Sequence, residues 1–243
     1  MDGQMIQATT SDGVVTAHLF CPADARTGVI MYMDAFGPRP ALFQMAARIA
    51  GWGHAVLVPD LFYRLAPYGP FDAKTAFAND TTRVQLRGLM TATTHARTEA
   101  DGATFLNLLT GAGVTGPVAT VGYCMGGAKA IIAAAACPDR IVAAASFHGG
   151  NLASDQPDSP HLRLGSIKGR VYVGSAAVDS SFSPEQSTLM AQALRAAELD
   201  HQMENYKGMV HGWTVPDSAA FNQSGAERHW QRLQVFLAET LPG

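Results

Sequence analysis

The sequence predicts an α/β fold, a mainly parallel sheet of about seven or eight strands with helices on both faces. Two observations carry this prediction. From residue 28 onward, short apolar runs alternate with longer runs of helical periodicity, as in chains built from successive β–α units. The runs at 28–33 and 54–59 are apolar without alternation, which is typical of strands that helices cover on both faces.

The predicted elements follow one another without an internal repeat or a linker. Residues 4–21 predict a hairpin, because two strand-like runs flank the turn sequence Ser11-Asp12-Gly13. Apolar positions three and four apart, with terminating glycines or prolines, predict helices; these lie at 41–51, 83–110 (one or two helices), 124–136, 184–199 and 225–240. Further strands are expected at 117–123, 141–147, 170–176 and 201–206.

Composition describes one globular unit. With 243 residues, 47% hydrophobic and 15% charged, we expect a single domain over 1–243 with no separate cap domain. The net charge of −3 comes without a basic block, so neither nucleic acid nor a membrane is an expected partner. The three cysteines lack metal-ligand spacing and no signal peptide is evident. We therefore expect a cytoplasmic protein without metal or cofactor, as a monomer or homodimer.

The segment 62–81 is a long connection with Pro67, Gly69, Pro70 and scattered aromatic residues. A long loop at this point of an α/β chain is either a lid or a segment that contacts substrate. Tyr63 and Arg64 would be its polar contacts, although an arginine here is equally well explained as a solvated ion-pair partner.

The stretch from Val118 to Ile132 carries the clearest chemical pattern. A small, β-branched run ends in Gly122-Tyr123-Cys124-Met125-Gly126-Gly127, and an Ala-rich helical run follows at once. This is the strand–turn–helix pattern of a nucleophile elbow, in which the glycines make room for a sharply turned nucleophile. The start of the helix favours a thiolate at Cys124. The alternative is a buried structural cysteine beside a pair of helix-packing glycines.

Two further reactive residues follow candidate strands, Asp179 after the run 170–176 and His211 after the strand-like run that starts at 201. The chain order nucleophile, acid, histidine is the order of the α/β-hydrolase sheet. In that chemistry Cys124 attacks a carbonyl carbon, His211 transfers protons, and Asp179 orients the imidazole.

Other residues at strand ends are candidates for the surroundings of this triad. The tetrahedral oxyanion needs two donors, for which we expect the N–H of Met125 and that of Ala35 or Phe36. Asp34 ends a buried strand where ligands bind in open α/β sheets, or it anchors the following loop. His148 also ends a strand but precedes the acid, which favours a pocket wall or a core histidine.

The motif Gly122-Tyr123-Cys124-Met125-Gly126-Gly127, together with Asp179 and the run 208–212, resembles the dienelactone hydrolase family. The resemblance extends over about residues 10–240, including Glu227-Arg228-His229-Trp230 in the last helix. It implies an α/β-hydrolase with a cysteine nucleophile that acts on esters and lactones. It also implies that Asp34 stands where the family's type enzymes carry a glutamate that activates the thiol. Arg64 matches one of their carboxylate-binding arginines, and Trp213 follows the His-Gly pair.

The sequence therefore favours a hydrolase of small esters or lactones, with Phe36, Tyr63, Arg64, His148 and Trp213 as candidate substrate contacts. Three other interpretations stay open at this point. The chain would then hydrolyse a thioester or an amide, bind a ligand without catalysis, or use Cys124 as a redox sensor. The missing C-x-x-C spacing counts against the redox interpretation.

Overall fold

The structure, a computed structural model, describes residues 1–242. Its strands form one eight-stranded sheet in the order β1-β2-β4-β3-β5-β6-β7-β8 over these residues. The hairpin β1–β2 and the pair β2–β4 are antiparallel, and the other neighbours are parallel. The strands are β1 (Gln4–Thr10), β2 (Gly13–Phe20), β3 (Gly28–Tyr32), β4 (Ala55–Pro59), β5 (Val118–Tyr123), β6 (Ile141–Phe147), β7 (Arg170–Val178) and β8 (His201–Val210).

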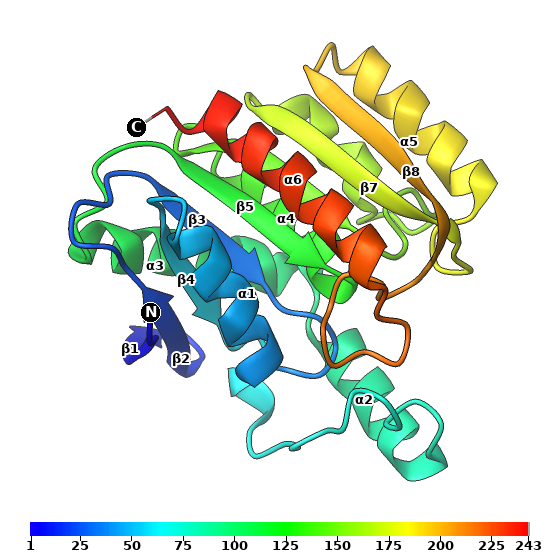
Figure 1. The fold of residues 1–243 in the computed structure, drawn as a ribbon, viewed down its shortest axis with the longest axis horizontal. Helices are drawn as coiled ribbons and strands as arrows, with labels where there is room; N and C mark the ends of the chain where they lie inside the picture. Colours follow the sequence, from blue (N-terminus) through cyan, green and yellow to red (C-terminus); the bar gives the residue numbers. More distant parts are fainter. Residues whose placement is uncertain (243) are drawn as a thin grey trace.

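Helices cover both faces of this sheet (Figure 1). They are α1 (Pro40–Ala50), α2 (Asp80–Ala92), α3 (His95–Gly111), α4 (Met125–Ala136), α5 (Pro184–Ala196) and α6 (Gln223–Thr240). Helices α1 and α6 lie on one face, and α3, α4 and α5 lie on the other (Figure 1). Helix α2 lies apart, beyond the edge at which β5 ends (Figure 1).

The burial of the central elements explains their sequences. Every residue of β3, β4 and β5 is buried, so these strands lack the alternation of a half-exposed strand. Helix α4 is buried from Met125 through Ala135, which explains why its sequence has no polar face. Helix α1 instead buries one stripe that includes Leu42, Met45 and Ile49, as expected for a helix that covers a sheet.

The structure confirms the predicted fold class and refines several boundaries. The region 83–110 is two helices, and the side chain of Thr94 accepts a hydrogen bond from the Arg97 N–H to begin α3. Strands β7 and β8 run on to Val178 and Val210. As a result, Asp179 and His211 are each the first residue after a strand of the same sheet.

Candidate active site

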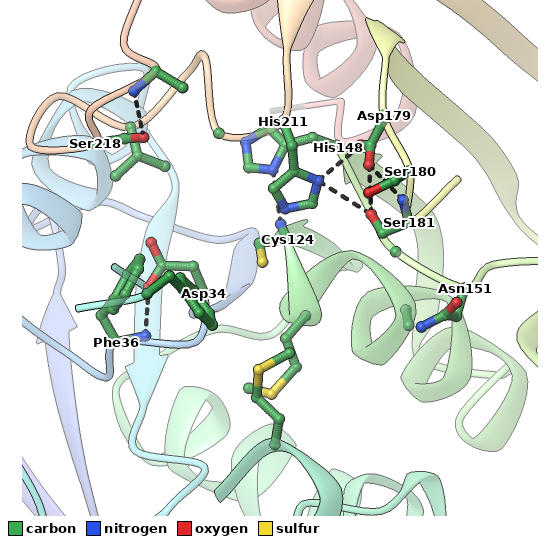
Figure 2. A pocket seen from close by; sticks show the side chains of 18 of the residues that line it. Asp34, Phe36, Cys124, His148, Asn151, Asp179, Ser180, Ser181, His211 and Ser218 are labelled. Carbon is green, nitrogen blue, oxygen red and sulfur yellow. Dashed lines mark hydrogen bonds and ion pairs between the residues drawn. The ribbon is translucent and has the colours of Figure 1, made fainter. Parts of the chain in front are cut away.

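A cavity of about 1090 Å³ opens at the carboxyl ends of the parallel strands. Cys124, His148, Asp179 and His211 line it, and each is the first residue after its strand, β5, β6, β7 and β8 respectively. Because parallel strands end at one edge of a sheet, residues from distant parts of the sequence meet there. Figure 2 shows the Cys124 thiol and the His211 ring facing the same space.

Cys124 occupies a strained turn between β5 and α4. Its backbone has φ 55° and ψ −120°, a conformation that costs of order 1–3 kcal/mol for a residue with a side chain. A β-carbon added at Gly122 would lie 2.7 Å from the Gly127 nitrogen and closer still to the Gly126 carbonyl. Only glycine therefore fits at position 122, and the elbow exists because the sequence supplies it.

Residues at the end of β6 accept hydrogen bonds from the Cys124 backbone. The Cys124 N–H donates to the Phe147 carbonyl at 3.1 Å and to His148 Nδ1 at 3.0 Å. An Nδ1 that accepts a hydrogen bond carries no proton, so His148 Nε2–H donates to Thr214 Oγ1 at 2.8 Å. Burial holds the pKa of His148 well below its ordinary value. His148 is thus a neutral support of the Cys124 backbone and part of the pocket wall.

His211 and Asp179 form a direct hydrogen-bonded pair. His211 Nδ1 lies 2.7 Å from Asp179 Oδ2, and the Asp179 side chain is almost completely buried. Ser181 completes the arrangement, because its N–H and Oγ–H both donate to Asp179 Oδ1, at 2.9 and 2.6 Å. The carboxylate is therefore held on one side by the loop after β7 and on the other by the imidazole.

The pKa values of this pair follow from these contacts. Burial alone would lower the pKa of His211, but hydrogen bonds with Asp179 and Cys124 outweigh it and raise that pKa to about 10. Burial alone would raise the pKa of Asp179, but hydrogen bonds from His211 and Ser181 hold it below its usual value. The geometry thus favours a charged imidazolium beside the Asp179 carboxylate.

The two expected oxyanion donors come from the start of α4 and from the loop after β3. Met125 is the first residue of α4, where backbone N–H groups have no partner within the helix. In the loop after β3, the Phe36 N–H donates to Asp34 Oδ1 at 3.0 Å. Of the two candidates after β3, Phe36 is therefore committed to the loop, which favours Ala35.

Asp34 lines the pocket, but its carboxylate is held by an arginine. Arg39 Nη1 and Nη2 donate to the two oxygens of Asp34 at 2.7 and 2.8 Å. Both side chains are mostly buried. The sequence left Asp34 as either a ligand-facing carboxylate or a loop anchor, and these contacts favour the anchor.

Three candidate substrate contacts lie elsewhere. Arg64 is buried in ion pairs with Asp101 and Asp12 at 2.8 and 2.6 Å, and Tyr63 Oη donates to the same Asp101. Arg64 is therefore an ion-pair partner, as the alternative interpretation had it, but a buried one and not a solvated one. Trp213 is fully buried against Tyr206, with ring centroids 4.8 Å apart. The segment 62–81 does reach the pocket, but through Ala73, Lys74 and Phe77.

Among residues 1–242, no helix is long and apolar enough to cross a membrane. Within the same residues, no group of three or more histidine, cysteine, aspartate or glutamate side chains is placed to hold a metal ion.

Comparison with known proteins decides the family. The model of the dienelactone hydrolase family matches residues 15–241. The chain belongs to the dienelactone hydrolase family. It is 25% identical to the carboxymethylenebutenolidase of Rhodococcus opacus over 233 residues, which cover 92% of this chain and 86% of that protein.

Two solved structures show how far the fold is shared. A structure from Klebsiella pneumoniae subsp. pneumoniae superimposes with a TM-score of 0.83 at 21% identity and covers 98% of both chains. A dienelactone hydrolase-like promiscuous phosphotriesterase from metagenomic libraries superimposes with a TM-score of 0.77 at 23% identity over 99% of both chains. The resemblance inferred from the elbow motif is thus confirmed, and the protein is a hydrolase of the dienelactone hydrolase family.

Some residues of this dienelactone hydrolase-family site were not foreseen from the sequence. Ser181 could have been found, because a serine two residues after a candidate acid is well placed to cap its carboxylate. Arg39 and Asp217 gave no such signal, since they are 178 residues apart and meet only in the fold. Lys129 lines the pocket from α4 and donates to the Thr93 carbonyl; in the sequence it stands unremarked among alanines and isoleucines.

Proposed function

We propose that this protein hydrolyses small esters or lactones through a Cys124–His211–Asp179 triad and a thioester acyl-enzyme. The observation that carries the proposal is the arrangement of three strand ends. Cys124 is displayed at positive φ on the elbow, and His211 bridges it to a carboxylate 2.7 Å away. That set of groups is the one that acyl transfer by a nucleophile, a proton carrier and an orienting acid requires.

The first half of the reaction forms the acyl-enzyme. The Cys124 thiolate attacks the carbonyl carbon, and the N–H groups of Met125 and Ala35 stabilise the resulting oxyanion. The carbon–oxygen bond to the leaving group then breaks, and protonated His211 donates its proton to the departing alkoxide. With a lactone, the alkoxide stays attached to the acyl chain, so the ring opens without loss of a fragment.

The second half releases the acid. Neutral His211 takes a proton from water, and the hydroxide attacks the thioester carbonyl. Collapse of the second oxyanion breaks the carbon–sulfur bond and regenerates the thiolate beside the imidazolium. Asp179 orients the imidazole in both halves, because its carboxylate accepts from Nδ1 and leaves Nε2 for the reacting atoms.

A cysteine substitution tests this proposal. In Cys124→Ala we expect hydrolysis of p-nitrophenyl esters to be lost, whereas Cys21→Ala should keep it, because Cys21 lies outside the pocket. Mass spectrometry of the wild-type protein, quenched during turnover of a slow ester, should find the acyl mass on the peptide that contains Cys124. Full activity in Cys124→Ala would refute the assignment of Cys124 as the nucleophile. Oxygen adducts on Cys124 after peroxide treatment, without any acyl adduct, would favour the redox alternative.

A further inference from the structure

Arg39 makes two bidentate ion pairs at once. Its Nη1 and Nη2 groups bind the carboxylate of Asp34, and its Nε and Nη2 groups bind that of Asp217, at 2.7 and 2.8 Å. The remaining Nη1–H donates to the Gly37 carbonyl at 3.2 Å. All five donors of the guanidinium are therefore used. We call the three side chains of Asp34, Arg39 and Asp217 the Arg39 clasp.

The clasp joins two loops that carry parts of the active site. Asp34 belongs to the loop after β3, which supplies the Ala35 N–H. Asp217 belongs to the loop after His211. Ser218 and Ala220, which follow Asp217 in this loop, line the pocket. Neither loop is part of a regular element, so their relative position depends on contacts of this kind.

The clasp also reaches the segment in front of α2. The Arg39 guanidinium lies 5.2 Å from the centre of the Phe36 ring, and that ring meets Phe77 edge to face at 5.4 Å. Both aromatic residues line the pocket. One guanidinium thus binds the loop after β3 and the loop after His211. Through Phe36 it also supports the pocket-lining segment in front of α2, which contains Phe77.

The hydrogen bonds of Asp34 decide its role within the clasp. Oδ1 accepts from the Phe36 N–H and from Arg39, and Oδ2 accepts from Arg39. The carboxylate is nearly excluded from solvent, where the charge of Arg39 compensates it strongly. A carboxylate compensated in this way does not serve as the base or counter-charge of the Cys124 thiol.

We propose that Arg39 is a positioning residue, which fixes the Ala35 N–H relative to His211 by binding Asp34 and Asp217 together. This inference rests on the proposed function, because it concerns the geometry of that machinery. It assigns activation of the thiol to His211 alone and gives Asp34 a mechanical role.

Substitution of Asp217, which does not line the pocket, gives the sharpest test. Asp217→Asn removes one arm of the clasp while leaving Asp34 and Cys124 unchanged. We expect kcat to fall about tenfold with little change in KM, since displacement of a reacting group by about 1 Å costs up to about 100-fold. The acid limb of the pH profile of kcat/KM should keep its midpoint, because the thiol and His211 keep their neighbours. Arg39→Lys should resemble Asp217→Asn, because an ammonium does not bind two carboxylates bidentately.

Chemical rescue tests the guanidinium itself. In Arg39→Ala we expect kcat to fall about 100-fold, and millimolar guanidinium, far below denaturing concentrations, should restore much of it. Wild type should not respond. Arg48→Ala is the matched control, because Arg48 makes a similar bidentate pair with Glu227 at 2.9 and 2.8 Å outside the pocket. It should lower the melting temperature at most, and leave kcat unchanged.

The outcomes are distinct. Unchanged kcat in both Asp217→Asn and Arg39→Lys overturns the positioning role of Arg39. The role is also overturned if Asp34→Asn shifts the acid limb of the pH profile while Asp217→Asn leaves kcat unchanged, because Asp34 would then be the partner of the thiol. If Arg39→Ala does not fold, the other two variants still decide the matter. Cys124→Ala is assayed alongside: full activity there defeats the proposed function and the clasp with it, whereas an inactive Cys124→Ala beside an unaffected Asp217→Asn defeats the clasp alone.

Discussion

Replacing Gly122 by alanine tests whether the elbow's geometry sets the rate. The added β-carbon would lie 2.7 Å from the Gly127 nitrogen and nearer still to the Gly126 carbonyl, whereas ordinary van der Waals contact begins at 3.4 Å. The start of α4 must therefore move away from β5 by at least 0.7 Å, the difference between 3.4 and 2.7 Å. Both clashing groups are backbone, so no rotation of a side chain relieves the contact.

The displacement has two consequences of different size. Overpacking in a rigid core costs about 1–3 kcal/mol, which lowers the melting temperature but leaves most molecules folded at 25 °C. The same movement shifts the Met125 N–H, which belongs to the first turn of α4. Misplacement of a reacting group by about 1 Å costs about 100-fold in rate. We therefore expect kcat to fall about 100-fold in a protein that is still folded.

The assay is kcat for a p-nitrophenyl ester at 25 °C, with circular dichroism and thermal melting on the same samples. Gly88→Ala is the control, because Gly88 lies on the exposed face of α2 and an added β-carbon meets nothing within 4 Å. That variant should gain about 0.5–1 kcal/mol of stability from higher helix propensity and keep its activity. A Gly122→Ala enzyme with wild-type kcat would refute the argument that the glycine holds the nucleophile and the oxyanion donor in register.

Three further predictions concern charged groups. In Asp179→Asn, kcat should fall about 10⁴-fold. Asp179 helps raise the pKa of His211 from 6.5 to about 10, so Asp179→Asn should also lower the free energy of unfolding. This loss, measured in urea at several pH values, should be greatest just below pH 6.5 and should shrink as the pH rises toward 10. Burial lowers the pKa of Lys129 from 10.5 to about 8, so Lys129→Met should raise the free energy of unfolding at pH 7 by about 1–2 kcal/mol after the lost hydrogen bond is counted. This gain in stability should fade between pH 8 and 10.5. A gain that stays constant over that range would contradict the prediction. Arg64→Gln should lower the free energy of unfolding by about 3 kcal/mol, because it leaves a buried carboxylate unpaired, yet leave KM unchanged; a large rise in KM would restore Arg64 as a substrate contact.

The sequence was sufficient for the fold and for the strand ends because both depend on local pattern. Unbroken apolar runs identified β3 and β4 as buried strands, a small, β-branched run identified β5, and the family resemblance was visible in six consecutive residues around Cys124. Asp179 and His211 were found because each lies shortly after a predicted strand, in the chain order of the α/β-hydrolase sheet.

Contacts between distant loops could not be predicted in the same way. Arg64 was a candidate pocket residue because it lies in the long segment 62–81 and matches a family arginine, but the fold places two carboxylates, Asp12 and Asp101, within its reach. Arg39 carried no pattern of its own, yet it connects residues 34 and 217. Where a long side chain ends depends on which charges the tertiary structure brings near it, and periodicity holds no information about that.

The attachment of the Cys124 backbone to the end of β6 has a consequence for how this enzyme can diversify. Cys124, its support His148, Asp179 and His211 all directly follow strands of the central sheet. The front of the pocket comes instead from residues 73–95, which include α2. Exchange of that segment between relatives would therefore alter which molecules enter while the reacting groups stay in place. New substrate ranges can then arise on this scaffold by changes in one replaceable piece.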